Sequence, residues 1–157
     1  MRKVCLVVAL GLAAGLIAAG CGDDDDDGGE SQTLDLLSVE QPALAGEIKV
    51  GGPGDGFLIA DELQENGDAV GSTWGVCTYI GGDGRPDGAD CEINLDLTDR
   101  GTLAVQGLLK FDSDTFDAAI IGGTGDYAGA NGTLTADISN DKETPITAEF
   151  TTESSDD

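Results

Sequence analysis

The sequence contains no histidine, few basic residues and few aromatic residues. Its 157 residues include 7 Lys and Arg against 31 Asp and Glu, which gives a formal net charge of −24. The lack of histidine excludes Ser-His-Asp and Cys-His nucleophilic systems and the usual zinc sites. The acidic excess excludes nucleic acids and anionic lipid headgroups as partners, because both are bound through Lys and Arg. Any acid–base chemistry would therefore fall to carboxylates or to Tyr79 and Tyr127.

The amino-terminal segment has the order of a secretory signal. Arg2 and Lys3 precede an apolar run over residues 4–19, which is shorter than the roughly 20 residues that a membrane-spanning helix needs. The four residues at 18–21, Ala-Ala-Gly-Cys, resemble a bacterial lipobox, although Leu is commoner than Ala at position 18. We therefore predict a cleaved lipoprotein signal over 1–20 and lipidation of Cys21; ordinary secretion and an uncleaved anchor are the alternatives.

An acidic segment follows the predicted cleavage site. Residues 23–27 are five consecutive aspartates, and glycines come next. Like charges repel one another and glycine-rich chains bury no core, so residues 21–32 are interpreted as a lipidated cysteine with a flexible tether. A calcium site on the aspartate run is the alternative. Cleavage would bring the net charge to about −26, and the acidic residues 153–157 are predicted to be a disordered tail.

Residues 33–152 have the length of one domain and the alternation of β-strands. In residues 92–97, Ile93, Leu95 and Leu97 alternate with polar side chains. Similar segments lie at about 34–40, 56–64, 69–80, 101–110, 116–122, 133–138 and 146–151, separated by clusters of Gly, Asp, Asn and Pro. Eight strands without an amphipathic helix predict an all-β fold, either a closed antiparallel barrel or a sandwich.

The cysteines support an exported domain. Cys77 and Cys91 lie in consecutive predicted strands at equal distances from Gly84, so an antiparallel hairpin would bring them face to face. We expect a disulfide between them. The intervening residues 81–90 are rich in Asp and Gly, as any hairpin loop is, and calcium binding there is the alternative interpretation.

Residues 118–132 resemble the Gly-Gly-Thr-Gly, aromatic, Gly-Ala, Gly signature shared by dirigent proteins and allene oxide cyclases. Further similarity at residues 75–77 and 105–107 extends the resemblance over about 56–140. It implies an eight-stranded antiparallel β-barrel, closed at one end by the aromatic residue, and a homodimer or homotrimer. The motif residues are Gly122, Gly123, Thr124, Gly125, Tyr127, Gly129, Ala130 and Gly132.

The sequence departs from the plant cyclases where their chemistry lies. They carry an acidic and amide cluster in the first strand, which residues 34–40 here do not match. Their pocket cysteine corresponds to Cys77, for which Cys91 is the expected disulfide partner. No catalytic residue, metal site or cofactor is therefore assigned. A protein that binds or orients a small hydrophobic molecule is the main hypothesis, and a cyclase-like isomerase is the alternative.

The predicted disulfide also predicts which side chains face the barrel lumen. Odd-numbered residues of 71–79 must share a face with Cys91 and the leucines that follow it. Trp74 has the opposite parity and is interpreted as packing on the barrel wall or at a subunit interface, with ligand stacking as the alternative. The expected ligand-binding residues are Gly75, Cys77, Tyr79, Leu95 and Leu97. The chain is expected in the cell envelope, anchored by lipid to the outer face of the cytoplasmic membrane.

Overall fold

The computed structural model describes residues 30–41, 55–81, 87–140 and 142–152. The predicted signal, Cys21, the aspartate run and the acidic tail lie outside these residues. No helix in the described part is long and apolar enough to cross a membrane. The strands are β1 (Glu30–Glu40), β2 (Gly56–Glu65), β3 (Asp68–Ile80), β4 (Gly88–Leu97), β5 (Gly101–Lys110), β6 (Thr115–Gly123), β7 (Asn131–Asp137) and β8 (Glu143–Thr152), with one 3-10 turn, η1 (Gly125–Tyr127).

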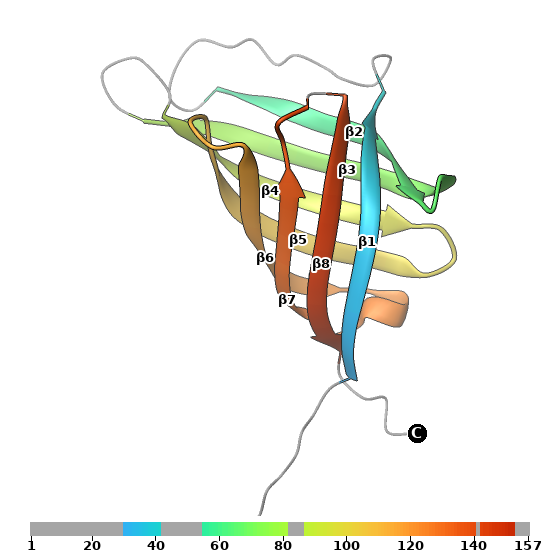
Figure 1. The fold of residues 1–157 in the computed structure, drawn as a ribbon. Helices are drawn as coiled ribbons and strands as arrows, with labels where there is room; N and C mark the ends of the chain where they lie inside the picture. The colour runs from blue at the N-terminus through green and yellow to red at the C-terminus, as the bar shows by residue number, and fades with distance from the viewer. Residues whose placement is uncertain (1–29, 42–54, 82–86, 141, 153–157) are drawn as a thin grey trace, which may run out of the picture.

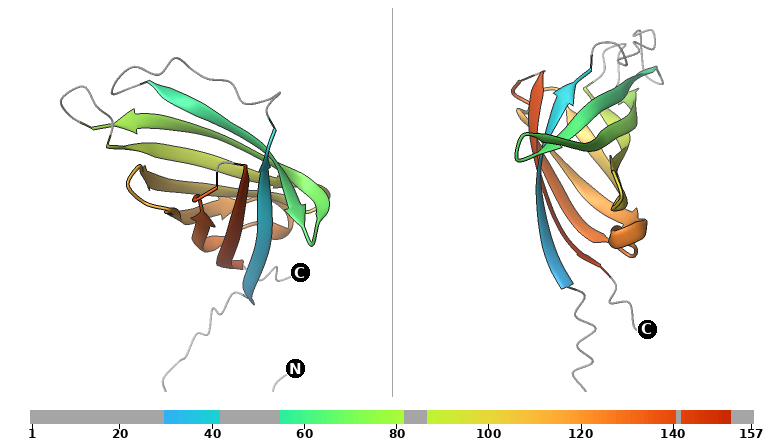
Figure 2. Two further views of the ribbon diagram at one scale, coloured as in Figure 1. Left: turned by 45° about the horizontal axis from the view of Figure 1, so that its top comes forward. Right: turned by 90° about the vertical axis from the view of Figure 1, so that its right-hand side faces the viewer.

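The eight strands form the closed antiparallel barrel that the resemblance implied, and they follow one another around it in chain order. Each strand pairs with its sequence neighbour, and β8 closes the barrel by pairing with β1 from Glu30↔Thr152 to Val39↔Glu143 (Figures 1 and 2). The seam between β1 and β2 is the shortest of the barrel, because these two strands pair only from Leu37↔Gln64 to Glu40↔Asp61.

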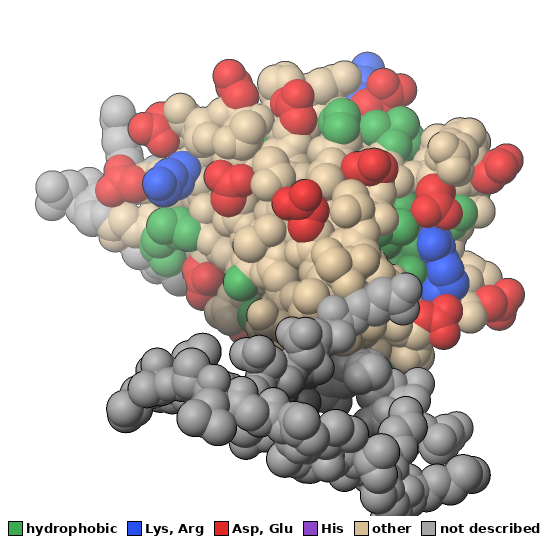
Figure 3. Space-filling view, turned by 60° about the horizontal axis from the view of Figure 1, so that its bottom comes forward, with side chains coloured by type: hydrophobic (Ala, Val, Ile, Leu, Met, Phe, Trp, Pro, Cys, Tyr) green, Lys and Arg blue, Asp and Glu red, His purple; other side chains and the backbone are tan. Residues whose placement is uncertain are grey.

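Alternation along the strands separates a buried lumen from an acidic exterior. In β4 the side chains of Cys91, Leu95 and Leu97 are buried, whereas Glu92 and Asp96 are exposed. The surface in Figure 3 accordingly carries many scattered Asp and Glu side chains and few Lys or Arg. The charge excess is therefore carried on the outside, where hydration keeps its free-energy cost low.

The first strand begins earlier than the sequence suggested. Glu30, Ser31 and Gln32, which were assigned to the tether, pair with Thr152, Thr151 and Phe150 of β8. The apolar alternation begins only at Leu34, so hydrophobicity gave no sign of these residues. Backbone pairing with β8 extends the strand beyond its apolar face, so residues 30–32 belong to the barrel wall.

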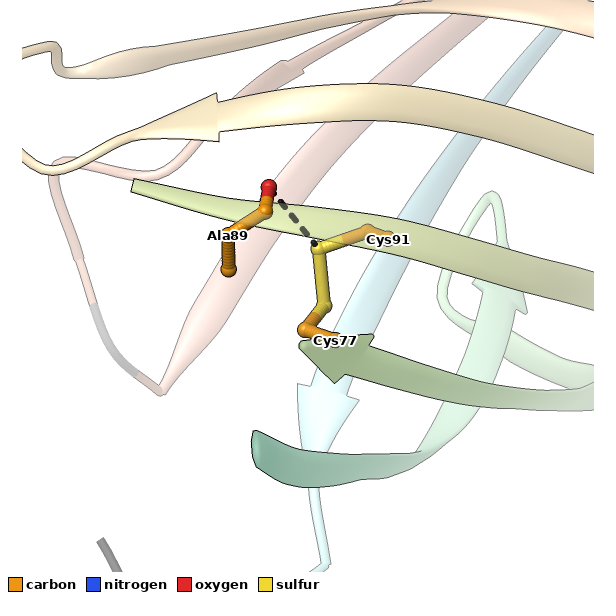
Figure 4. Close-up of a disulfide and its surroundings, with 3 residues drawn as sticks. All are labelled: Cys77, Ala89 and Cys91. Atoms are coloured by element: carbon orange, nitrogen blue, oxygen red, sulfur yellow. Dashed lines mark hydrogen bonds between the residues drawn. A yellow bond between two sulfur atoms is a disulfide. The ribbon is translucent and has the colours of Figure 1, made fainter. Parts of the chain in front are cut away.

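The predicted disulfide joins Cys77 to Cys91 (Figure 4). The two residues are direct Cα partners in the β3–β4 pair, with Cα atoms 4.0 Å apart. Both are fully buried, and the Cys91 sulfur lies 3.9 Å from the Ala89 carbonyl oxygen. The bridge closes the hairpin around the loop that contains residues 82–86, which lie outside the described part.

One end of the barrel is filled by side chains around η1. Tyr127 is only 4% exposed, and its ring meets that of Phe150 edge-on at a centroid distance of 5.7 Å. A Cβ atom at Gly123 would overlap the Tyr127 backbone oxygen, so only glycine lets η1 fold back against β6. The leucines at 63, 97 and 103 are also fully buried. Open space is therefore left toward the opposite end.

Candidate ligand-binding site

An elongated space runs from the middle of the lumen to the end where β7 turns into β8. The inner cavity has a volume of about 160 Å³, and a pocket of about 270 Å³ at the mouth shares five lining residues with it. An engineered cavity of about 150 Å³ in another protein binds benzene. The inner cavity is lined by Ser38, Ile59, Asp61, Thr73, Ile93, Leu95, Val105, Phe116, Leu134, Ala136, Ile138, Thr144 and Ile146.

The lining is divided between a polar wall and an apolar wall. The polar side chains come from four adjacent strands, β8, β1, β2 and β3, which contribute Thr144, Ser38, Asp61 and Thr73 respectively. Strands β4 to β7 contribute only aliphatic and aromatic side chains. A ligand in this cavity would therefore meet hydrogen-bonding groups on one side and hydrocarbon on the other.

Asp61 is the only ionisable residue among those lining the inner cavity in the described structure. It lies on the luminal face of β2 with Ile59 and Leu63 on either side. The Ser38 hydroxyl donates a 2.9 Å hydrogen bond to its Oδ2. An ionised carboxylate has further acceptor capacity beyond this single bond, so it can receive a donor from a ligand.

Thr73 faces Asp61 directly across the β2–β3 pair. The residue is 4% exposed, and its Oγ1 has no hydrogen-bond partner in the structure. A buried polar atom without a partner costs about 1–3 kcal/mol. Such an atom beside an open cavity marks a position where a bound molecule can supply the missing hydrogen bond.

A second carboxylate and a group of aromatic rings lie on the strands that form the cavity. Glu40 is the direct partner of Asp61 in the β1–β2 pair and is exposed. On the neighbouring strands, the Tyr79 ring lies 5.6 Å from Phe57 and 5.8 Å from Phe111. Of these residues, only Phe57 lines the pocket at the mouth, so an aromatic ring borders the path by which a ligand would enter.

The five residues predicted to bind ligand are distributed along the luminal face, and only Leu95 lines the inner cavity. Leu97 is buried deeper, Cys77 is in the disulfide, and Tyr79 lies in the aromatic group. Gly75 leaves less space than the sequence suggested: a Cβ atom there would lie 2.9 Å from Ile93 Cγ1. The Ile93 side chain occupies the volume that the missing side chain leaves.

The polar wall was missed by the sequence reasoning, although a signal for it was present. In β2 the luminal positions are Phe57, Ile59, Asp61 and Leu63, so one acid interrupts an otherwise apolar row. In β1, Ser38 continues the buried row of Leu34 and Leu36 in the same way. An acid or hydroxyl at an apolar position of a strand is therefore the pattern that would have identified this site.

The other candidate features do not join the cavity. Trp74 is 49% exposed on the outer face beside Leu58 and Val76, and its Nε1 donates a hydrogen bond to Ser72 Oγ. It packs on the outside of the wall, and the ligand-stacking alternative in the lumen is thereby excluded. Within the described ranges, no group of three or more His, Cys, Asp or Glu residues could hold a metal ion. Asp83 of the 81–90 loop lies outside those ranges, whereas Asp87 and Asp90 lie within them.

Comparison with known proteins finds similarity in structure. No family model and no curated protein matches the sequence. A solved structure named pyocyanin demethylase matches with a TM-score of 0.62 and 26% identity, over 76% of this chain and all of the other. Two pterocarpan synthase dirigent proteins match with TM-scores of 0.65 and 0.57 at 18% and 19% identity, over 89% and 77% of this chain and 98% and 93% of theirs. The barrel therefore has the dirigent-like fold that the glycine-rich motif implied.

Proposed function

We propose that this dirigent-like barrel is a binding protein that holds a small, mainly hydrophobic molecule in its lumen. The observation that carries the proposal is the divided cavity, in which the apolar strands β4 to β7 face a short polar wall. An apolar cavity with a few convergent polar groups is the usual form of a small-molecule site. The names of the structural neighbours, which refer to pyocyanin and to a pterocarpan, support a small organic ligand.

The proposal can be tested by filling the cavity. Ala136 is buried and lines the apolar wall, so Ala136→Leu places its added carbons in the open space. Ethylbenzene is a suitable probe for a volume of this size. Titration followed by backbone amide chemical shifts should show saturable binding to the full chain and none to Ala136→Leu. Ala119→Leu, on the exposed face of β6, is the matched control and should bind ethylbenzene normally.

An isomerase is the second candidate, and Asp61 is the observation that favours it. A carboxylate beside an apolar cavity wall can hold or move a proton on a bound substrate. Stereoselective cyclisation of an epoxide or coupling substrate, lost in Asp61→Asn, would support catalysis. Pyocyanin should be tested as a further substrate, with its demethylation as the measured reaction, because one structural neighbour is named for that activity. Binding without conversion in all these assays would leave the barrel a binding protein.

We also propose that the barrel is carried at the cell envelope on a lipid attached to Cys21. Support comes from the sequence: the apolar run over 4–19 ends in small residues directly before this cysteine. The first described strand begins only nine positions later, at Glu30, so the aspartate-rich segment would form the link. The homo-oligomer stays a prediction of the family resemblance, and the exposed apolar group of Leu58, Trp74 and Val76 is the surface to test for it.

A further inference from the structure

We infer that the lumen selects hydrophobic amines, which it binds as ammonium ions between Asp61 and Thr73. This inference rests on the proposed binding function and adds the chemical class of the ligand. An ammonium group carries up to three N–H donors and a positive charge. The polar wall places the Asp61 carboxylate and the buried Thr73 hydroxyl side by side on adjacent strands, opposite an apolar wall sized for one ring.

The hydrogen-bonding groups of the polar wall leave two oxygens open to a ligand. Ser38 already donates a hydrogen bond to Asp61 Oδ2, and the remaining acceptor capacity of the carboxylate is left for a ligand. Among the described residues, the buried Thr73 oxygen has no hydrogen-bond partner, and Thr73 lies directly opposite Asp61. A group with several N–H donors can serve both oxygens at once. A neutral hydroxyl can also reach both, by donating to Asp61 and accepting from Thr73, so the positive charge is what favours the ammonium ion.

The charges around the cavity determine the sign of the ligand. None of the residues lining the inner cavity is basic in the described structure, so no protein cation pairs with Asp61 there. Glu40 lies directly opposite Asp61 on β1 with the same charge, an arrangement that destabilises a strand pair. A cation bound beside Asp61 offsets this repulsion. The strongly acidic exterior also raises the local concentration of cations near the mouth.

The test compares three one-ring probes of nearly equal size on the full chain. Benzylamine is an ammonium ion at neutral pH, benzyl alcohol is a neutral donor, and ethylbenzene has no polar hydrogen. Hydrogen bonds to charged groups make the expected difference large: benzylamine should bind at least about tenfold more tightly than benzyl alcohol. Asp61→Asn should remove that preference, and Thr73→Val should weaken benzylamine binding while leaving ethylbenzene binding unchanged.

Matched controls separate a local effect from the general acidity of the chain. Asp96→Asn removes the same charge from the exposed face of β4 and should keep the preference for benzylamine. Equal losses in Asp96→Asn and Asp61→Asn would overturn the inference, because the protein's overall field would then explain the selectivity. Benzyl alcohol binding as tightly as benzylamine to the unaltered chain would also overturn it, without any variant. Ethylbenzene binding in that case would still support the proposed function, and failure of all three probes would contradict both.

Discussion

Asp61 and Thr73 are direct partners across β2 and β3, and both side chains line the inner cavity. Adjacent side chains on one face of an antiparallel pair lie close enough to bind the same small group. Rigid strands hold the two residues, and the Ser38 hydroxyl fixes the carboxylate with a 2.9 Å hydrogen bond. The site is therefore preorganised, which reduces the entropy lost when a ligand binds.

The disulfide is expected to stabilise the barrel substantially. Cys77 and Cys91 are separated by 14 positions, and a bridge closing a loop of this length contributes about 3 kcal/mol in the chain-entropy model. The full chain can be reduced while denatured and then refolded by removing the denaturant. A denaturant titration of this reduced chain should give a free energy of unfolding lower by about that amount than for the oxidised chain. Thiol labelling of the denatured, unreduced chain should find neither Cys77 nor Cys91 free. Labelling of both would rule the bridge out.

The adjacent glycines 122 and 123 should differ sharply in tolerance to a methyl group. A Cβ atom at Gly123 would overlap Tyr127 and lie 2.8 Å from the Thr102 oxygen, whereas nothing lies within 4 Å of one at Gly122. Overpacking of this kind costs about 1–3 kcal/mol, so Gly123→Ala should lower the free energy of unfolding by that amount. Gly122→Ala should change it by less than about 0.5 kcal/mol.

Denaturant titration of both variants measures the difference directly. If Gly122→Ala proved as destabilising as Gly123→Ala, the motif would need its glycines for general backbone flexibility. The expected difference between the two variants would instead show that Gly123 is needed for the close packing of η1 against β6.

Lipidation of Cys21 is expected to hold the chain on the membrane. Cys21→Ser removes the thiol that would carry the lipid, so the variant should lose membrane association in a fractionated bacterial host. Cys5→Ser, within the predicted signal, is the control and should leave association unchanged. Mass spectrometry of the membrane-bound chain should find a lipid-modified Cys21 at its amino terminus. An unmodified mature chain that begins at another residue would contradict the prediction.

The alternation in β4, β7 and β8 is nearly uninterrupted, which was sufficient to predict an all-β fold. Alternation left a barrel and a sandwich open, and the barrel was implied by the resemblance of the glycine-rich motif. The sequence also placed Cys77 opposite Cys91, since the hairpin is symmetric about one turn residue. The start of β1 was missed because Ser31 and Gln32 carry no apolar signal. The volume of the lumen was beyond prediction, because it depends on how Ile93 packs over Gly75 and on how far the side chains around Tyr127 fill the closed end.

The burial of Tyr127 predicts a loss of stability in alkali. Burial raises the pKa of Tyr127 above its ordinary value of 10.0; the positive charge of Arg100 opposes this rise, and Glu65 and Asp126 add to it. A raised pKa in the folded state means that folding favours the protonated phenol. This contribution is fully present below pH 10.0 and is lost as the pH rises through the higher folded-state pKa.

Tyr127→Phe isolates the effect, because phenylalanine keeps the ring that meets Phe150 edge-on and cannot ionise. Denaturant unfolding of the full chain and the variant should give a constant difference in stability at neutral pH. Above pH 10.0 the unaltered chain should lose stability relative to Tyr127→Phe, since only it must deprotonate a buried phenol or unfold to do so. Parallel titration curves for the two proteins would mean that the phenol is as well solvated in the barrel as in the unfolded chain, and that Tyr127 does not seal the closed end.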